Sequence, residues 1–171
     1  MSRLVLCLIA ASALTAAAFA QTPGPPAQFG RPLYPPGTPN PLEDKDLAPA
    51  AEVASSFGLK GHLAVDCTTD PGTLGHVRFH EQADGSLINE SVDPDGSRVL
   101  TIMLKGKRLD DQHIEFLGYA SYNGPPLKRL VWQTDGTRFR FVSSQALDGT
   151  WLIRDSRFGA RVWQWVTPCK D

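Results

Sequence analysis

The sequence predicts an all-β fold: an antiparallel up-and-down meander of eight or nine strands that closes as a barrel, preceded by one short helix. Two features predict the strands. Short segments of alternating apolar and polar residues fill the chain after residue 58, and tight-turn pairs separate them. Asp-Gly and Asn-Gly pairs supply the positive φ angles of tight hairpins, and they occur at Asp84-Gly85, Asp95-Gly96, Asn123-Gly124, Asp135-Gly136 and Asp148-Gly149.

The chain begins with the pattern of a secretory signal peptide. Arg3 precedes an apolar run from Leu4 to Leu14, and Ala18-Phe19-Ala20 is a small-x-small cleavage site. The run is shorter than the ~20 residues of a membrane-spanning helix. We therefore expect residues 1–20 to be removed, the mature chain to have no stable membrane insertion, and the protein to be exported, either periplasmic or secreted.

Residues 21–48 are expected to form a proline-rich tether. Nine of the fourteen prolines lie in residues 21–49, and proline cannot donate to a β-ladder. A spacer is the expected role, and a segment for a proline-binding partner is the alternative. The barrel domain is then residues 49–171, and it opens with a helix that starts near Pro49 and ends at Gly58.

Nine segments after this helix have the period-two pattern of strands. Strands joined by tight turns pair with their sequence neighbours, and closing the meander into a barrel removes the exposed sheet edges. The expected strands are residues 59–66, 75–82, 86–92, 97–105, 112–121, 126–134, 137–145, 150–155 and 161–166.

Two cysteines remain once the signal peptide and Cys7 are removed. Cys67 ends the first expected strand and Cys169 follows the last one, and disulfides persist in the oxidising compartments that exported proteins reach. A redox-active pair is the alternative, but the Cys-x-x-Cys spacing of such pairs is missing. We therefore predict a structural Cys67–Cys169 disulfide that joins the two ends of the meander.

The start of the domain resembles the lipocalin or calycin plan, in which a short helix precedes a strand that opens with Gly-x-large and continues as a meander. Lipocalins usually carry Gly-x-Trp here, whereas this chain has Gly61-His62-Leu63 and lacks the tryptophan. The segment GLKGHLAVDC with a near-terminal cysteine is also similar to a group of small exported proteobacterial proteins. The resemblance implies a barrel over residues 57–169.

One phase of the expected strands is rich in large apolar side chains, which should face the barrel interior. These side chains either line an apolar ligand cavity or pack solid, and we expect at least a partial cavity at the open end. Phe116, Trp132 and Phe139 are the candidate ligand contacts from this set. The inward set consists of Val77, Phe79, Leu100, Ile102, Leu104, Ile114, Phe116, Leu130, Trp132, Phe139 and Phe141.

Glu90 is the polar exception to this inward set. It alternates in phase with Ile88 and Val92, which predicts an inward carboxylate and makes Glu90 a further candidate ligand contact. A buried carboxylate needs an arginine, a proton or access to solvent. A register shifted by one residue would instead place Glu90 on the outside.

The remaining polar residues predict no catalytic, cofactor or metal site. His76, Arg78 and His80 share a strand face that should be solvated, and the two histidines would stand about 13 Å apart, too far to share a metal ion. The chain has no nucleophile-elbow, zinc-protease or phosphate-loop motif. Its mature charge, sixteen basic against eighteen acidic residues, gives no attraction to nucleic acid.

These observations predict an exported, non-enzymatic barrel that binds a small apolar ligand, without a cofactor. Two alternatives remain open. One is a protein-binding module of the cell envelope, for example an inhibitor of exported hydrolases, that uses outward Arg78, Arg138 and Arg140. The other is an enzyme with Glu90 or a histidine as general base at the barrel mouth.

Overall fold

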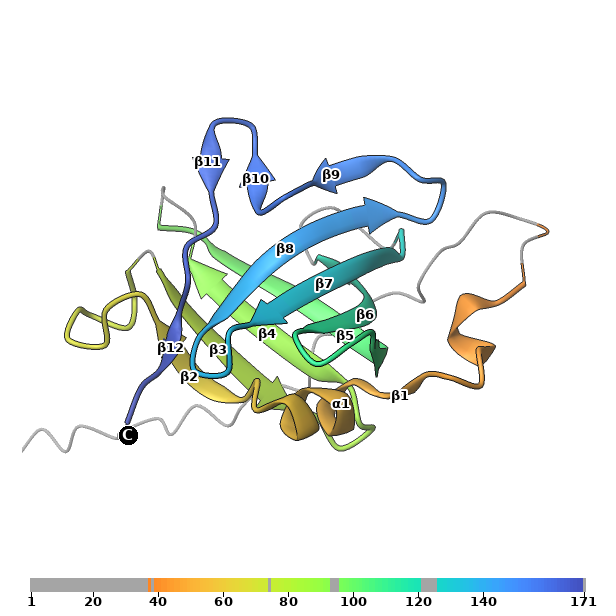
Figure 1. Ribbon diagram of the computed structural model, residues 1–171, viewed down its shortest axis with the longest axis horizontal. Coiled ribbons are helices and arrows are strands. Elements are labelled where there is room, and N and C mark those ends of the chain that lie inside the picture. Colours follow the sequence, from red (N-terminus) through yellow and green to blue (C-terminus); the bar gives the residue numbers. More distant parts are fainter. Residues whose placement is uncertain (1–36, 38, 74, 93–95, 121–125, 171) are drawn as a thin grey trace, which may run out of the picture.

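The computed structural model describes residues 37, 39–73, 75–92, 96–120 and 126–170. One large antiparallel sheet dominates it, with strands in the order β12-β2-β3-β4-β5-β6-β7-β8-β9 and with β1 paired to β5. The sheet curls strongly into a half-barrel (Figure 1). The strands are β1 (Ala48–Pro49), β2 (Gly61–Ala64), β3 (His76–Glu81), β4 (Leu87–Val92), β5 (Arg98–Arg108), β6 (His113–Ala120), β7 (Lys128–Thr134), β8 (Phe139–Ala146), β9 (Trp151–Ile153), β10 (Arg157–Phe158), β11 (Arg161–Val162) and β12 (Thr167–Pro168).

The predicted all-β meander is confirmed, and its closure is partial. Val166 forms both hydrogen bonds of a bridge to Phe139 at the start of β8, and the next two residues pair with β2 as β12. The C-terminal segment therefore connects the two sides of the sheet at one end only. The predicted last strand, 161–166, is interrupted because the chain leaves the sheet after β9 and turns back as the small β10–β11 hairpin.

Helix α1 (Ala50–Phe57) covers the concave side of the sheet at one end (Figure 1). Gly58 ends the helix in the left-handed conformation, with a φ of 82°, which glycine adopts without steric cost. The buried face of the helix includes Val53 and Phe57, and the Phe57 ring meets Phe139 with 6.1 Å between centroids. Helix and sheet thus share one apolar core. The helix lies between Pro49 and Gly58, as predicted.

The segment before the helix is partly described. A 3-10 turn, η1 (Pro41–Glu43), interrupts the expected extended tether, and β1 begins to pair with β5 at Ala48, one residue before the expected domain start. The predicted signal peptide and most of the predicted tether lie outside the described residues.

The aspartates of the predicted turns stabilise these turns through side-chain hydrogen bonds as well as through their backbone. In the Asp84, Asp135 and Asp148 turns the carboxylate accepts a hydrogen bond from the backbone N–H two residues later. The Ser86 hydroxyl bonded to Asp84 and the Arg138 backbone N–H bonded to Asp135 contribute most at those two turns, and with the bonds above they stabilise the charged form and lower the pKa of each aspartate. The glycine that follows each aspartate has a positive φ, so the local sequence accounts for both halves of the turn.

The predicted disulfide is present. Cys67 and Cys169 are bonded with their Cα atoms 5.5 Å apart, within the usual range for disulfides. The Cys169 backbone N–H also donates to the His62 carbonyl, so that the bond continues the β12–β2 pairing. The disulfide therefore joins the end of β2 to the end of β12.

Candidate ligand-binding pocket

A cavity of about 610 Å³ lies on the concave side of the sheet, beyond the core that α1 covers. Its origin is a gradient of side-chain size along the strands. Towards the helix, the inward residues are large and close-packed, including Leu87, Phe116 and Ile114. Towards the other end they are small, namely Ser91, Val99, Thr101, Ala120 and Ser144, and all five line the cavity.

The β9–β11 arm, residues 151–163, forms the other wall of this pocket. Leu152, Ile153, Phe158, Arg161 and Trp163 all line the cavity. Figure 1 shows the arm on the opposite side of the molecule from α1. Phe158 is 61% exposed, although it also lines the cavity. The arm therefore carries apolar groups at the boundary between the pocket and solvent.

Lys128 is the more buried of the two charged residues that line this pocket among the described residues. It starts β7 in the same phase as Leu130 and Trp132, so all three line the cavity. Lys128 is only 6% exposed. Among the described residues, no carboxylate forms an ion pair with its ammonium group, and no Asp or Glu lines the cavity. Burial lowers the pKa of Lys128, because the charged form is poorly solvated there.

Two more polar groups of the pocket have unused hydrogen-bonding capacity. The side-chain Oδ1 of Asn89 and the indole Nε1 of Trp163 are buried, and neither has a hydrogen-bond partner among the described residues. Unsatisfied buried polar groups are rare in folded proteins and each costs roughly 1–3 kcal/mol. The pocket therefore combines apolar walls with polar groups that lack partners within the described protein.

Replacing Lys128 with methionine is expected to raise the free energy of unfolding by roughly 1–3 kcal/mol near neutral pH. The substitution removes a buried charge that has no ion-pair partner among the described residues, and it keeps a side chain of similar length. The folded-state pKa of Lys128 is lowered from 10.5. Its penalty is thus complete below the folded-state pKa and is relieved as the pH rises from there towards the unfolded-state value.

The stability advantage of K128M over the wild type should therefore shrink as the pH rises. Urea denaturation of both proteins from neutral to alkaline pH measures this difference, and titrations that the two proteins share, such as that of Tyr119, largely cancel. An advantage that stays constant with pH, or a wild type more stable than K128M at neutral pH, would contradict the expected penalty.

The residues predicted as ligand contacts separate into three groups. Trp132 lines the cavity and packs edge-on against Phe79, with 5.4 Å between ring centroids. Phe116 and Phe139 belong to the core beneath the cavity and are not among its lining residues. Glu90 lies on the other face of the sheet. Lys128 was missed by the sequence analysis, although its alternation with Leu130 and Trp132 placed it on the inward face.

The predicted inward orientation of Glu90 is wrong. Asn89 and Ser91 face the cavity instead, and the Glu90 carboxylate accepts a hydrogen bond from Arg98 at 2.8 Å and lies 3.2 Å from the ring of His80. The same shift of phase applies to β5, where Val99 and Thr101 line the cavity in place of Leu100, Ile102 and Leu104. Both strands carry apolar residues on both faces, so alternation did not identify the inward one.

A second, polar cavity of about 310 Å³ lies on this outer face. Arg78, Glu90 and Arg98 line it together with His76 and residues of the loop before β3. Arg78 and Arg98 line the cavity with the Glu90 carboxylate, which already forms an ion pair with Arg98. These groups form an ion-pair cluster at the surface, and they do not form an enclosed acid–base pair.

The predicted solvated face of β3 requires a correction at His76, which is only 3% exposed. The Thr69 hydroxyl donates to the Asp66 carbonyl and so accepts from His76 Nε2. In the neutral ring the remaining nitrogen, Nδ1, accepts from His62 Nε2 at 2.8 Å. The disulfide-anchored loop after β2 thus covers His76, whereas His80 stays exposed.

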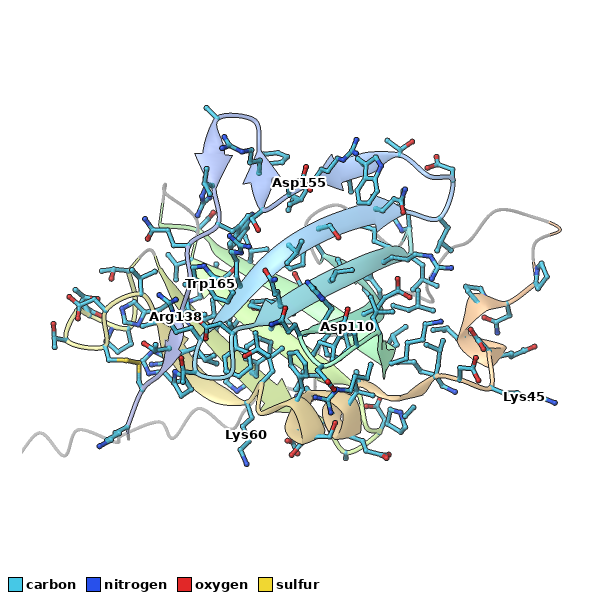
Figure 2. All side chains as sticks on the ribbon, viewed as in Figure 1. Lys45, Lys60, Asp110, Arg138, Asp155 and Trp165 are labelled. Atoms are coloured by element: carbon cyan, nitrogen blue, oxygen red, sulfur yellow. A yellow bond between two sulfur atoms is a disulfide. The ribbon has the colours of Figure 1, made fainter. Side chains whose placement is uncertain are left out.

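Two of the three arginines proposed for partner binding, Arg138 and Arg140, lie against an aromatic ring. Arg140 lies over Trp165 with its guanidinium carbon 4.6 Å from the ring centroid, and Arg138 lies 5.3 Å from the same centroid. Figure 2 shows Arg138 next to Trp165. Arg138 also pairs with Asp135 at 2.7 Å. Both arginines therefore hold the segment before β12 against the β7–β8 hairpin.

The described residues contain no group of three or more histidine, cysteine or acidic side chains placed to hold a metal ion. None of their helices has the length and apolar character needed to span a bilayer. Comparisons of the chain with protein-family models, with curated proteins and with solved structures found no match.

Proposed function

We propose that this protein is an exported, non-enzymatic barrel that binds a small apolar ligand between the curled sheet and the β9–β11 arm. The observation that carries the proposal is the cavity of about 610 Å³. Small-molecule sites typically enclose about 300–1,000 Å³ and combine apolar walls with a few polar groups. Leu130, Trp132 and Phe141 provide such walls, while Asn89 and Lys128 provide polar groups.

A lipocalin-like role is consistent with this proposal. The curled antiparallel meander with one helix at its end is compatible with the lipocalin plan, in which a barrel holds one small ligand. The Cys67–Cys169 disulfide and the signal-like start of the chain support export. Trp132 and Trp163 add broad apolar faces that suit a hydrophobic ligand.

The two alternative functions have weaker support. Among its described lining residues the cavity holds two cations, Lys128 and Arg161, but no acidic residue or histidine to exchange a proton with them. A partner module that uses Arg78, Arg138 and Arg140 would first have to detach the last two side chains from Trp165. We therefore favour ligand binding.

Native mass spectrometry of the protein purified from its source, followed by organic extraction, tests the proposal directly. We expect a bound mass that organic solvent releases as a small hydrophobic compound. Protein that carries no such mass, and that also fails to bind decanol after purification, would overturn the proposal.

Substituting Ala120 with phenylalanine should block the pocket, because the new ring would extend into the cavity that Ala120 lines. We expect decanol affinity to fall by about tenfold or more while the protein remains folded, since the cavity leaves room for the ring. Calorimetric titration measures the affinity, and thermal unfolding checks the fold.

Leu109→Trp is the matched control for the Ala120 variant. Leu109 lies in the turn after β5 and is 48% exposed, so added bulk there should leave decanol affinity unchanged. Equal losses in both variants would show that decanol binds elsewhere.

A further inference from the structure

We propose that the natural ligand is amphipathic, with an apolar tail and a single carboxylate head, and that the Lys128 ammonium binds this head. The inference rests on the proposed function and specifies the chemistry of its ligand. The charges that line the cavity are unbalanced among the described residues. Lys128 is 94% buried, it has no ion-pair partner among the described residues, and no described acidic residue lines the cavity with it.

The hydrogen-bonding groups of the pocket favour an acceptor as the bound head group. Lys128 offers three N–H donors and no acceptor. The indole N–H of Trp163 is a further buried donor without a partner among the described residues. A carboxylate supplies only acceptors, and its negative charge compensates the ammonium. A neutral hydroxyl would accept the hydrogen bonds but would leave the buried charge uncompensated.

The position of Lys128 also separates head from tail. On β7 it lies at the end of the strand that has small inward neighbours, next to Gly118 of β6 and Ala146 of β8. Leu130 and Trp132 follow it in the same phase towards the core. A ligand whose head meets Lys128 would therefore place its apolar tail along Leu130, Trp132 and the inner face of the β9–β11 arm.

Arg161 is the competing cation of the pocket. Its guanidinium carbon lies 5.1 Å from the ring centroid of Trp163 on the arm, and it is more exposed than Lys128. Arg161 is partly exposed and so keeps part of its hydration, whereas the buried Lys128 ammonium has lost most of its own. The buried ammonium therefore gains more from a carboxylate than the arginine does.

Calorimetric titration with decanoate and with decanol tests the inference, because these probes share a tail and differ in the charge of the head. We expect the wild type to bind decanoate about tenfold or more tightly than decanol. In K128M this ratio should fall to near one. Lys60→Met is the matched control, because it removes the same charge outside the cavity. Lys60 lies beside α1, and Figure 2 shows it pointing away from the sheet. The preference of this variant for decanoate over decanol should equal that of the wild type.

The possible failures are distinguishable. A wild type that binds both probes equally would overturn the carboxylate inference and leave the proposed function standing. A wild type that binds neither probe would overturn both. A preference for decanoate that survives in K128M but disappears in Arg161→Met would reject Lys128 as the binding group.

Discussion

Replacing Cys67 and Cys169 together with serine is expected to lower the free energy of unfolding by about 4 kcal/mol. The two cysteines are 102 residues apart in the sequence, and chain-entropy arguments give ~4.7 kcal/mol for closing a loop of about 100 residues. The disulfide also fastens β12 to β2, where only two residue pairs hold the last strand. A loss of this size is a large share of the ~5–15 kcal/mol that stabilises most domains.

Urea denaturation with and without a thiol reductant separates the disulfide from side effects of the serines. Reductant should lower the stability of the wild type to that of the double variant and should leave the variant unchanged. A double variant as stable as the oxidised wild type would show that the disulfide adds nothing to the fold. A wild type indifferent to reductant, with both sulfurs free by mass spectrometry, would show that the bond does not form.

Substituting Gly118 with alanine is expected to destabilise the protein by about 3 kcal/mol or more, at the upper end of overpacking effects. A Cβ at this position would overlap the carbonyl oxygen of Ile102 and would lie 3.0 Å from the Cα of Met103. Both are backbone atoms and cannot rotate away. The close approach arises because β5 has a register shift between Met103 and Lys105 directly opposite Gly118.

Gly72→Ala provides the control for a glycine-to-alanine change without a backbone collision. A Cβ there would meet only the Asp70 carboxylate, at 3.3 Å, and that side chain can move. We expect its effect on the free energy of unfolding to remain within about 0.5 kcal/mol. Chemical denaturation of both variants measures the contrast, and a Gly118 variant as stable as the wild type would mean that β5 relaxes away from β6.

The features that the sequence predicted correctly depend on residues close together in the chain or on very few candidates. Each described Asp-Gly turn combines a carboxylate acceptor with a glycine at positive φ, so three or four residues suffice to specify it. Gly58 ends the helix for the same reason. The disulfide was predictable because only Cys67 and Cys169 remain after the expected signal peptide.

Which face of a strand points inward was decided by the tertiary structure wherever both faces carry apolar residues. On β4 the pair Ile88 and Val92 competes with Leu87, and the curl of the sheet placed Leu87 in the core and Glu90 outside beside Arg98. Alternation alone cannot separate two apolar faces, because a shift of one residue exchanges them. A bulge, such as the one in β5, changes the phase again along the same strand.

The meander, its tight turns, the helix ends and the disulfide were predictable from the amino-acid sequence, because each follows from local backbone preferences or from a single possible pairing. Long-range packing was needed to show that the sheet closes at one end only, that the loop after β2 covers His76, and that the small inward residues gather at one end to form a cavity. The same packing sets the environment of Lys128, because its desolvation depends on residues far away in the chain that surround the ammonium.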